Sequence, residues 1–306
     1  MKLVQIEEKE FDRYVKTEPD CSVYHTARWN GFFKNPKSTY QYLAYADDLD
    51  FYHAYALVEI RKRNIFSKLE AVLEYGYLIN FYDTNLFDSF HRDLCDYLKT
   101  QKVKVMTISP NILYETPFGN NDFLVKKLEG LGYKKVNDVY TYTRSFDEVE
   151  EADKPVKYTV FDAEKEDLEL IEKQYGYEIS DAVDYFGKDI RVKAITIDFE
   201  GTYATIEEQL NEDPENESLL NLKNDVDQAM EKYGKPILEY VCFICYDKHA
   251  YILYTDYLKN NIEAIDVLWN ALSNELRSGE YKGYSCSKSF IGSKENKRIG
   301  EFTLYL

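Results

Sequence analysis

The chain has 306 residues, of which 44% are hydrophobic and 16% aromatic, so it is long and apolar enough to bury two ordinary cores and too hydrophobic for a disordered chain. Its formal net charge of −17 excludes a broad, sequence-independent grip on nucleic acid, because neutralising phosphates needs clustered Lys and Arg. No stretch approaches the roughly 20 apolar residues of a membrane span, and the first ten residues lack the pattern of a signal peptide.

The first half of the chain predicts a mixed α/β module. Strands are expected at residues 39–47, 53–61, 71–80, 103–108 and 139–146. One helix is expected to begin at an N-cap signal near Asp83 and Thr84, because Leu86, Phe90 and Leu94 follow at helical spacing. A second helix is expected over residues 123–131, and Gly132 is expected to end it.

An acidic segment at residues 147–154, followed by Pro155, is the predicted domain boundary. After it, helices are expected over residues 167–175, 181–189 and 262–276, and strands over residues 192–198, 237–246, 250–254, 281–286 and 299–305. The order of elements in the first half therefore recurs. We predict two copies of one α/β module, residues 1–150 and 151–306.

A helical hairpin interrupts the second module. Apolar residues alternate at spacings of three and four along two segments of residues 199–233, and a polar break at residues 211–217 separates the segments. This pattern predicts an antiparallel coiled-coil arm inserted between two strands. Ten acidic residues oppose only Lys223 and Lys232 there, a net charge of 2 − 10 = −8, so we expect a structural or partner-docking element rather than a tRNA-binding one.

Metal and redox chemistry are not expected. The five cysteines show no disulfide-framework spacing, and the four histidines show no ligand spacing. Cys242 and Cys245 form a Cys-x-x-Cys sequence, but an odd spacing on a strand sends two side chains to opposite faces.

Short motifs in a fixed order resemble the FemABX family of aminoacyl-tRNA-dependent peptidyltransferases. They are Ser-Val-Tyr-His-Thr-Ala-Arg-Trp at residues 22–29 with Lys34 following, Tyr-Gly-Tyr-Leu-Ile-Asn-Phe-Tyr-Asp at 75–83, Ile-Ser-Pro at 108–110, Leu-Glu-Gly-Leu-Gly-Tyr at 128–133, Tyr-Gly-Tyr at 175–177 with Tyr-Phe at 185–186, and Arg-Ile-Gly-Glu-Phe-Thr-Leu at 298–304. Each motif is weak alone, and their order and spacing carry the resemblance. The chain departs from the family pattern at Ser109, where the family has Asp, and near Ser180 and Asp181, where the family has Arg.

The resemblance implies tandem N-acetyltransferase-like (GNAT) domains and transfer of an amino acid from aminoacyl-tRNA to an amine of a peptidoglycan-precursor stem peptide or another peptide. It implies no cofactor beyond the aminoacyl-tRNA co-substrate, and no metal. It places the protein in the cytoplasm, and it leaves open a peripheral contact with the inner face of the membrane and a homo- or heterodimer.

Six residues are the candidates that the resemblance implies for the site. Lys288 is the expected cation for the oxyanion or for a ribose phosphate, and Tyr254 is the expected hydrogen-bond partner of the acyl group or the incoming amine. The expected substrate-binding residues are Lys34, Tyr77, Ser109 and Tyr185.

Two other functions remain open on the sequence. An acyl-CoA-dependent N-acyltransferase would need a glycine-rich turn that offers backbone N–H groups to a pyrophosphate, and neither residues 80–83 nor residues 256–259 contain a glycine. A non-catalytic relative with a binding or scaffolding role would explain the substituted Asp and Arg positions.

Overall fold

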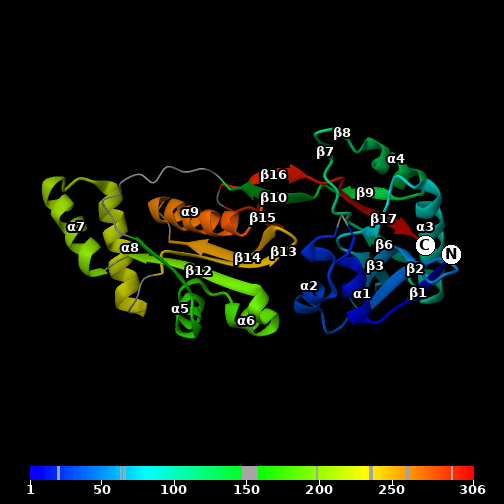
Figure 1. The fold of residues 1–306 in the computed structure, drawn as a ribbon, viewed down its shortest axis with the longest axis horizontal. Helices are drawn as coiled ribbons and strands as arrows, with labels where there is room; N and C mark the ends of the chain where they lie inside the picture. Colours follow the sequence, from blue (N-terminus) through cyan, green and yellow to red (C-terminus); the bar gives the residue numbers. More distant parts are fainter. Residues whose placement is uncertain are drawn as a thin grey trace. The chain divides into compact units, whose positions relative to one another are not determined.

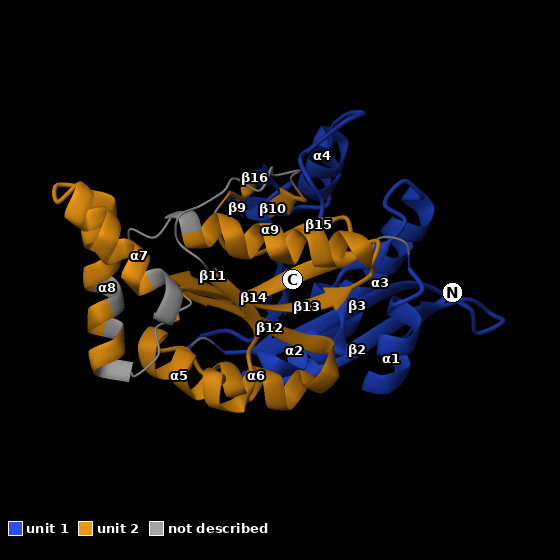
Figure 2. Cartoon of the chain, turned by 60° about the vertical axis from the view of Figure 1, so that its left-hand side comes forward, with its two compact units in different colours: residues 1–142, 295–306 blue, residues 143–294 orange. Residues whose placement is uncertain are grey.

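The structure is a computed structural model that describes residues 1–18, 21–62, 64, 67–146, 158–197, 199–233, 237–258, 262–290 and 292–306. These residues form two compact units, residues 1–142 with 295–306 and residues 143–294 (Figures 1 and 2). The chain leaves the first unit in strand β10 (Tyr140–Ser145) and returns to it in β16 (Lys294–Lys297). The predicted linker at residues 147–154 lies outside the described residues.

The first unit is built on an eight-stranded sheet. Its strands are β1 (Lys2–Gln5), β2 (Thr39–Ala46), β3 (Tyr52–Arg61), β4 (Glu70–Leu73), β5 (Tyr77–Ile79), β6 (Val105–Ile108), β9 (Lys134–Asn137) and β17 (Glu301–Tyr305). They lie in the order β1-β2-β3-β4-β6-β17-β9, and β5 pairs with β3. The remaining elements are α1 (Glu8–Val15), the 3₁₀ turn Val23–His25, α2 (Ala27–Phe32), α3 (Thr84–Thr100), the short strands β7 (Glu115–Thr116) and β8 (Gly119–Asn120), and α4 (Asp122–Gly130).

Strand β3 shows how alternation divides the first sheet into two faces. Ala54, Ala56 and Val58 are fully buried in the core that contains the apolar side chains of α3 and α4. The residues between them face α1, where the ring of Phe11 lies 6.1 Å from that of Tyr55. One face of the sheet therefore holds the main core, and the other is available for a pocket.

The last strand of the chain belongs to the first unit, which corrects the predicted domain limits. Strand β17 pairs antiparallel with both β6 and β9, so residues 301–305 fill a gap inside the first sheet. The sequence predicts this strand as the end of the second module, because nothing in the sequence indicates that the chain returns to the first unit. The predicted strand 71–80 is also two strands, since the backbone turns at Gly76 with φ of +79°.

The second unit repeats the same plan. Its strands β11 (Tyr158–Asp162), β12 (Ile190–Ile197), β13 (Glu239–Tyr246), β14 (His249–Tyr257) and β15 (Gly283–Cys286) lie in that order and continue into β10 and β16. Helix α9 (Ile262–Ser278) covers one face, and α5 (Lys165–Tyr175) and α6 (Ile179–Phe186) cover the other (Figures 1 and 2). In each unit a helix joins two parallel strands, β4 to β6 through α3 and β14 to β15 through α9. The predicted recurrence of elements is therefore present.

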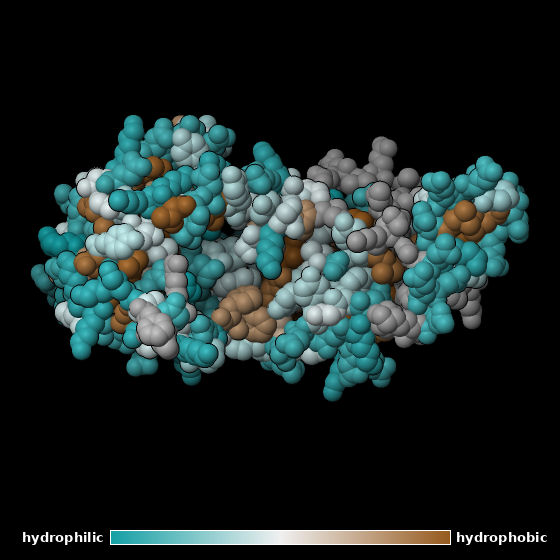
Figure 3. Space-filling model, turned by 180° about the vertical axis from the view of Figure 1, so that it is seen from behind, coloured by the Kyte–Doolittle hydropathy of each residue, from teal (hydrophilic) through white to brown (hydrophobic). Residues whose placement is uncertain are grey.

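The helical hairpin consists of α7 (Phe199–Glu212) and α8 (Glu217–Tyr233). Ile206 and Leu222 of the predicted apolar seams are buried, and Lys223 donates a hydrogen bond of 2.7 Å to the hydroxyl of Tyr203 across the two helices. The supercoil of a coiled coil stays a prediction. Figure 3 shows a mainly hydrophilic surface over the hairpin, as its acidic composition predicts. Among the helices of the described residues, none is both long and apolar enough to cross a membrane.

A carboxyl group is buried in the second unit. Glu239, at the start of β13, is 1% exposed, and its Oε1 accepts a hydrogen bond of 2.9 Å from Nε1 of Trp269 on α9. Burial raises the pKa of Glu239 to about 8, although Trp269 and the charge of Arg144 oppose that rise. The carboxyl group is therefore largely protonated near neutral pH.

This buried acid predicts a loss of stability at alkaline pH. The folded-state pKa of Glu239 lies above that of the unfolded chain, so its favourable contribution is complete below about pH 4.5 and is lost as the pH rises through about 8. We expect Glu239→Gln to remove up to about 4 kcal/mol of that decline, at about 1.4 kcal/mol for each pKa unit. The measurement is the free energy of unfolding in urea at pH 5–9, with the exposed-site variant Glu208→Gln as control. Parallel curves for the wild type and Glu239→Gln would contradict the assignment.

Candidate functional site

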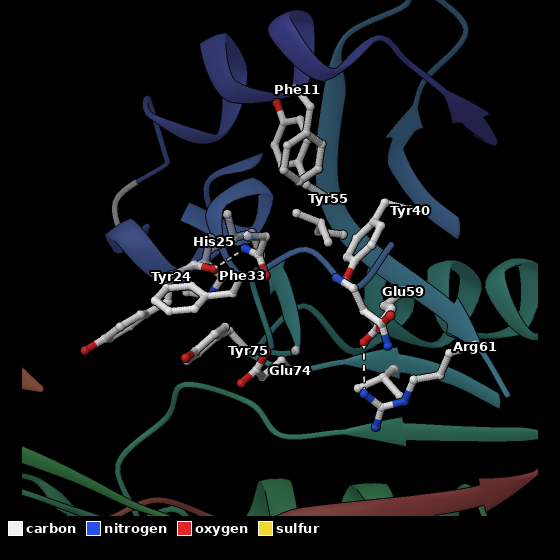
Figure 4. A pocket seen from close by; sticks show the side chains of 16 residues that line it. Phe11, Tyr24, His25, Phe33, Tyr40, Tyr55, Glu59, Arg61, Glu74 and Tyr75 are labelled. Atoms are coloured by element: carbon white, nitrogen blue, oxygen red, sulfur yellow. Dashed lines mark hydrogen bonds and ion pairs between the residues drawn. The ribbon is translucent and has the colours of Figure 1, made fainter. Parts of the chain in front are cut away.

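The first unit contains a pocket of about 170 Å³ on the face of its sheet that α1 and α2 cover (Figure 4). Four alternate residues of β3 form its floor, namely Tyr55, Leu57, Glu59 and Arg61. The walls come from the segment that contains the 3₁₀ turn and α2, and from the turn between β4 and β5. A strand with one face in the core thus presents every second side chain to the pocket.

A stack of aromatic rings forms one wall. The rings of Tyr24 and Tyr75 lie parallel, with centroids 4.6 Å apart, and Trp29 meets Tyr24 edge-on at 5.1 Å. The guanidinium of Arg298 lies over the other ring of the pair, 5.5 Å from the centroid of Tyr75. This stack fixes the ring planes that the pocket offers to a ligand.

Arg298 also fixes the backbone behind the pocket. It is 5% exposed, and its guanidinium donates to the carbonyl oxygens of Ser109 and Pro110, the second over 3.0 Å. Pro110 in turn lies against Gly76, where an added Cβ would come within 2.7 Å of the Cα of Pro110. Desolvation lowers the pKa of Arg298, while Tyr75 and the charge of Glu74 oppose that shift. The residue just before the closing strand therefore positions the β4–β5 turn.

His25 lines the pocket as a neutral imidazole. Burial lowers its pKa to about 4, and the charge of Arg298 contributes further. Its Nδ1 accepts a hydrogen bond of 3.1 Å from the backbone N–H of Ser22. At neutral pH His25 thus adds no positive charge to the pocket.

Carboxylates give the pocket its charge. Glu59 accepts hydrogen bonds from Ser38 Oγ at 2.6 Å and from Arg61 Nη1 at 3.1 Å. Desolvation raises the pKa of Glu74, and the charge of Glu59 raises it further. Ring faces beside two carboxylates and one guanidinium suit a ligand that carries amine and polar groups.

The predicted residues of the first half fall at different distances from the pocket. The ammonium of Lys34 lies 5.0 Å from the ring centroid of Tyr40, which lines the pocket, so Lys34 stands beside it. Ser109 is buried behind the wall and contributes its carbonyl to Arg298. Tyr77 is 3% exposed in the hydrophobic core, where its hydroxyl pairs with that of Tyr133 at 2.9 Å. A substrate-binding role for Tyr77 is therefore wrong, because its side chain faces away from the pocket into the α3–α4 core.

Two of the predicted residues of the second half, Tyr254 and Lys288, lie on segments that pass the end of β15. Strand β14 runs past this end, and the ring of Tyr254 on β14 lies 5.7 Å from that of Tyr177. Lys288 is exposed two residues beyond β15, and its backbone N–H contacts Sγ of Cys286 at 3.4 Å. A cavity of about 320 Å³ lies between the end of β14 and this segment, lined by Thr255, Tyr257, Ser289 and Phe290. No hydrogen bond joins Lys288 to Tyr254 in the described part of the chain.

Tyr185 lies on α6 of the second unit, 42% exposed, with its ring 4.9 Å from that of Phe186. Burial raises the pKa of Tyr254, and the charges of Glu178 and Asp181 add to the rise. Asp181 is one helical turn from Tyr185.

No group of His, Cys, Asp and Glu with metal-ligand geometry occurs among the described residues.

Removing the Arg298 guanidinium should destabilise the first unit. In Arg298→Ala the carbonyls of Ser109 and Pro110 lose their donor, and we expect the free energy of unfolding to fall by about 3 kcal/mol. Urea unfolding measured by fluorescence tests this, because Trp29 reports on the first unit. Arg13→Ala, at an exposed arginine of the same unit, is the control. An unchanged midpoint for Arg298→Ala would show that the guanidinium does not support the turn.

Solved structures identify the class of fold. A crystal structure of FemX has a TM-score of 0.68 at 14% identity and covers 100% of this chain and 98% of its own. A tandem GNAT protein from the clavulanic acid biosynthesis pathway has a TM-score of 0.55 at 8% identity, with 99% of this chain and 98% of its own covered. The fold is therefore that of tandem GNAT-like proteins. The sequence matches no curated protein.

The family follows from the sequence itself. The model of the FemAB family matches residues 6–159, just over half of the chain. The protein belongs to the FemAB family, and membership of this family supports an acyltransferase-type function in cell-wall synthesis.

Proposed function

We propose that the protein transfers an amino acid from aminoacyl-tRNA to an amine of a peptidoglycan-precursor stem peptide or a similar peptide. In this reaction the amine nitrogen forms a bond to the ester carbonyl carbon, and the bond from that carbon to the ribose oxygen breaks. The proton lost by the amine ends on the released ribose hydroxyl. Because the ester is already activated, the protein needs mainly to position the amine and to stabilise the oxyanion.

The pocket of the first unit is the observation that supports this proposal most. Its ring faces and the carboxylates of Glu59 and Glu74 suit a peptide that carries an amine. Lys34, beside the pocket at Tyr40, is suited to a phosphate of a nucleotide-linked or lipid-linked acceptor. This assigns acceptor binding to the first unit.

We assign binding of the aminoacyl-tRNA donor to the second unit. Lys288 is the proposed cation for the oxyanion or for a ribose phosphate, and Tyr254 is the proposed hydrogen-bond partner of the acyl group or the amine. Two features support this: Lys288 is exposed, and Tyr254 is only partly buried where β14 runs past the end of β15. Tyr185 is a further proposed contact, on the same side of the unit as Tyr254.

Acyl-CoA is the alternative donor, and the likeness to a tandem GNAT protein favours keeping it. One feature opposes it in the first unit. The N-terminus of α3 is capped by the Asp83 carboxylate, which accepts a hydrogen bond of 3.0 Å from the N–H of Leu86. This negative group occupies the helix end that a pyrophosphate would need. The corresponding residues 259–261 before α9 lie outside the described residues.

The remaining expectations are part of the proposal. Aminoacyl-tRNA and nucleotide-linked precursors would place the protein in the cytoplasm, with peripheral contact to the inner membrane face if the acceptor is lipid-linked. The same proposal includes a dimer, formed either by two copies of this chain or by this chain and a related one. The hairpin α7–α8, with its net charge of −8 in sequence, is proposed to dock a protein partner rather than tRNA.

A transfer assay tests the proposal. The full chain is given charged tRNAs or acyl-CoA, with a stem-peptide precursor as acceptor, and the amide product is measured. We expect transfer from tRNA, and we expect Lys288→Ala to lower kcat by about 10²–10³ if the ammonium stabilises the oxyanion. Lys282→Ala, at an exposed lysine just before β15, is the control and should keep its activity.

Each alternative has its own outcome in this assay. Transfer from acyl-CoA alone would replace the proposal with the second function. Absence of transfer from every donor would support a non-catalytic binding role.

A further inference from the structure

Four tyrosines gather on the face of the second sheet that α5 and α6 cover, and we call them the tyrosine cluster. They are Tyr175, Tyr177, Tyr240 and Tyr254. The register of β13 and β14 pairs Tyr240 with Asp256, and Cys242 with Tyr254, so Tyr240, Tyr254 and Asp256 project on the same side. The ring of Tyr175 lies 5.1 Å from that of Tyr240, which identifies this side as the α5 face.

The charges around the tyrosine cluster are negative. The Asp256 carboxylate raises the pKa of Tyr240, in addition to the larger effect of burial. The carboxylates of Glu178 and Asp181 act in the same direction on Tyr254, and both are exposed. Aromatic rings beside carboxylates attract a cation, through the ring quadrupole and through direct charge.

One polar group in the tyrosine cluster lacks a hydrogen-bond partner. Tyr240 is fully buried, and its hydroxyl makes no hydrogen bond within the described residues. The hydroxyl of Tyr175, in contrast, donates to the carbonyl of Ile237 over 2.7 Å. Buried polar atoms in folded proteins are almost always paired, so an unpaired phenol on this face points to a ligand that supplies an N–H or O–H group.

We propose that the tyrosine cluster and Asp256 bind the ammonium group of the amino acid that the donor carries. An ammonium has three N–H donors, and the hydroxyls of Tyr240 and Tyr254 with the carboxylate of Asp256 are three acceptors. The inference rests on the proposed function, because it assigns the donor to the second unit. It is specific to the donor, since the acceptor amine must lose its charge before it attacks, while the α-amine of the donor stays protonated.

The test is binding of two small esters to the full chain at pH 6.5. Glycine methyl ester carries the ammonium, and methyl glycolate has a hydroxyl in its place. We expect the ammonium ester to bind about tenfold more tightly by calorimetry or NMR titration, and Asp256→Asn to abolish that difference. Glu169→Gln, which neutralises an exposed carboxylate elsewhere on α5, should leave the difference intact. Circular dichroism and thermal melting confirm that both variants fold.

Two results would overturn the inference: equal binding of the two esters, or an Asp256→Asn variant that keeps the preference for the ammonium. The transfer assay separates this failure from that of the proposed function. Transfer from charged tRNA together with equal ester binding would remove only the ammonium site. Ammonium-selective binding without transfer from any tRNA would remove the proposed function and leave a site for cationic amino-acid esters.

Discussion

The buried guanidinium of Arg298 is the interaction on which the first unit depends. It joins three parts of the chain that are distant in sequence: the β4–β5 turn, the Ser109–Pro110 segment after β6, and the return of the chain into β17. Taking an arginine out of water is unfavourable unless its donors are satisfied, and here two carbonyls and the face of Tyr75 take that role. Because the same ring stacks on Tyr24, the wall of the pocket and the end of the sheet share one support.

The two units share one arrangement of elements, but they differ where their paired parallel strands end. In the first, the parallel pair β4–β6 continues into a turn where Gly76 and Pro110 are in close contact. In the second, β14 runs on past the end of β15, and a cavity lies beside the extension. The end of the parallel pair is therefore filled by Gly76 and Pro110 in the first unit, and in the second unit a cavity lies beside the extension of β14.

Local pattern predicted most of the elements, and it failed where contacts are distant. Helix α3 was predictable because Asp83 caps it and its apolar residues recur at helical spacing, and the structure confirms both. The sequence of β3 alternates between buried and more polar positions, and Glu59 and Arg61 are two of the polar ones. The sequence does not identify them as pocket residues, because a polar strand face has the same pattern whether it faces solvent or a pocket. The expected substrate-binding role of Tyr77 fails for a similar reason. A tyrosine in a strand is compatible both with a binding site and with a hydrogen bond inside the core, and here it pairs with Tyr133. In the sequence Arg298 is only part of a motif, since nothing local reveals that its partners are nearly 190 residues away.

The position of β17 has a consequence for how the protein is made. This strand lies between β6 and β9, yet it leaves the ribosome only after residues 143–294 of the second unit. The amino-terminal half emerges early but must wait with an incomplete sheet, while the unit encoded in between has all its own strands first. The order of maturation is therefore the reverse of the order of synthesis, and the amino-terminal nascent half is exposed longest to chaperones and to premature pairing with other chains.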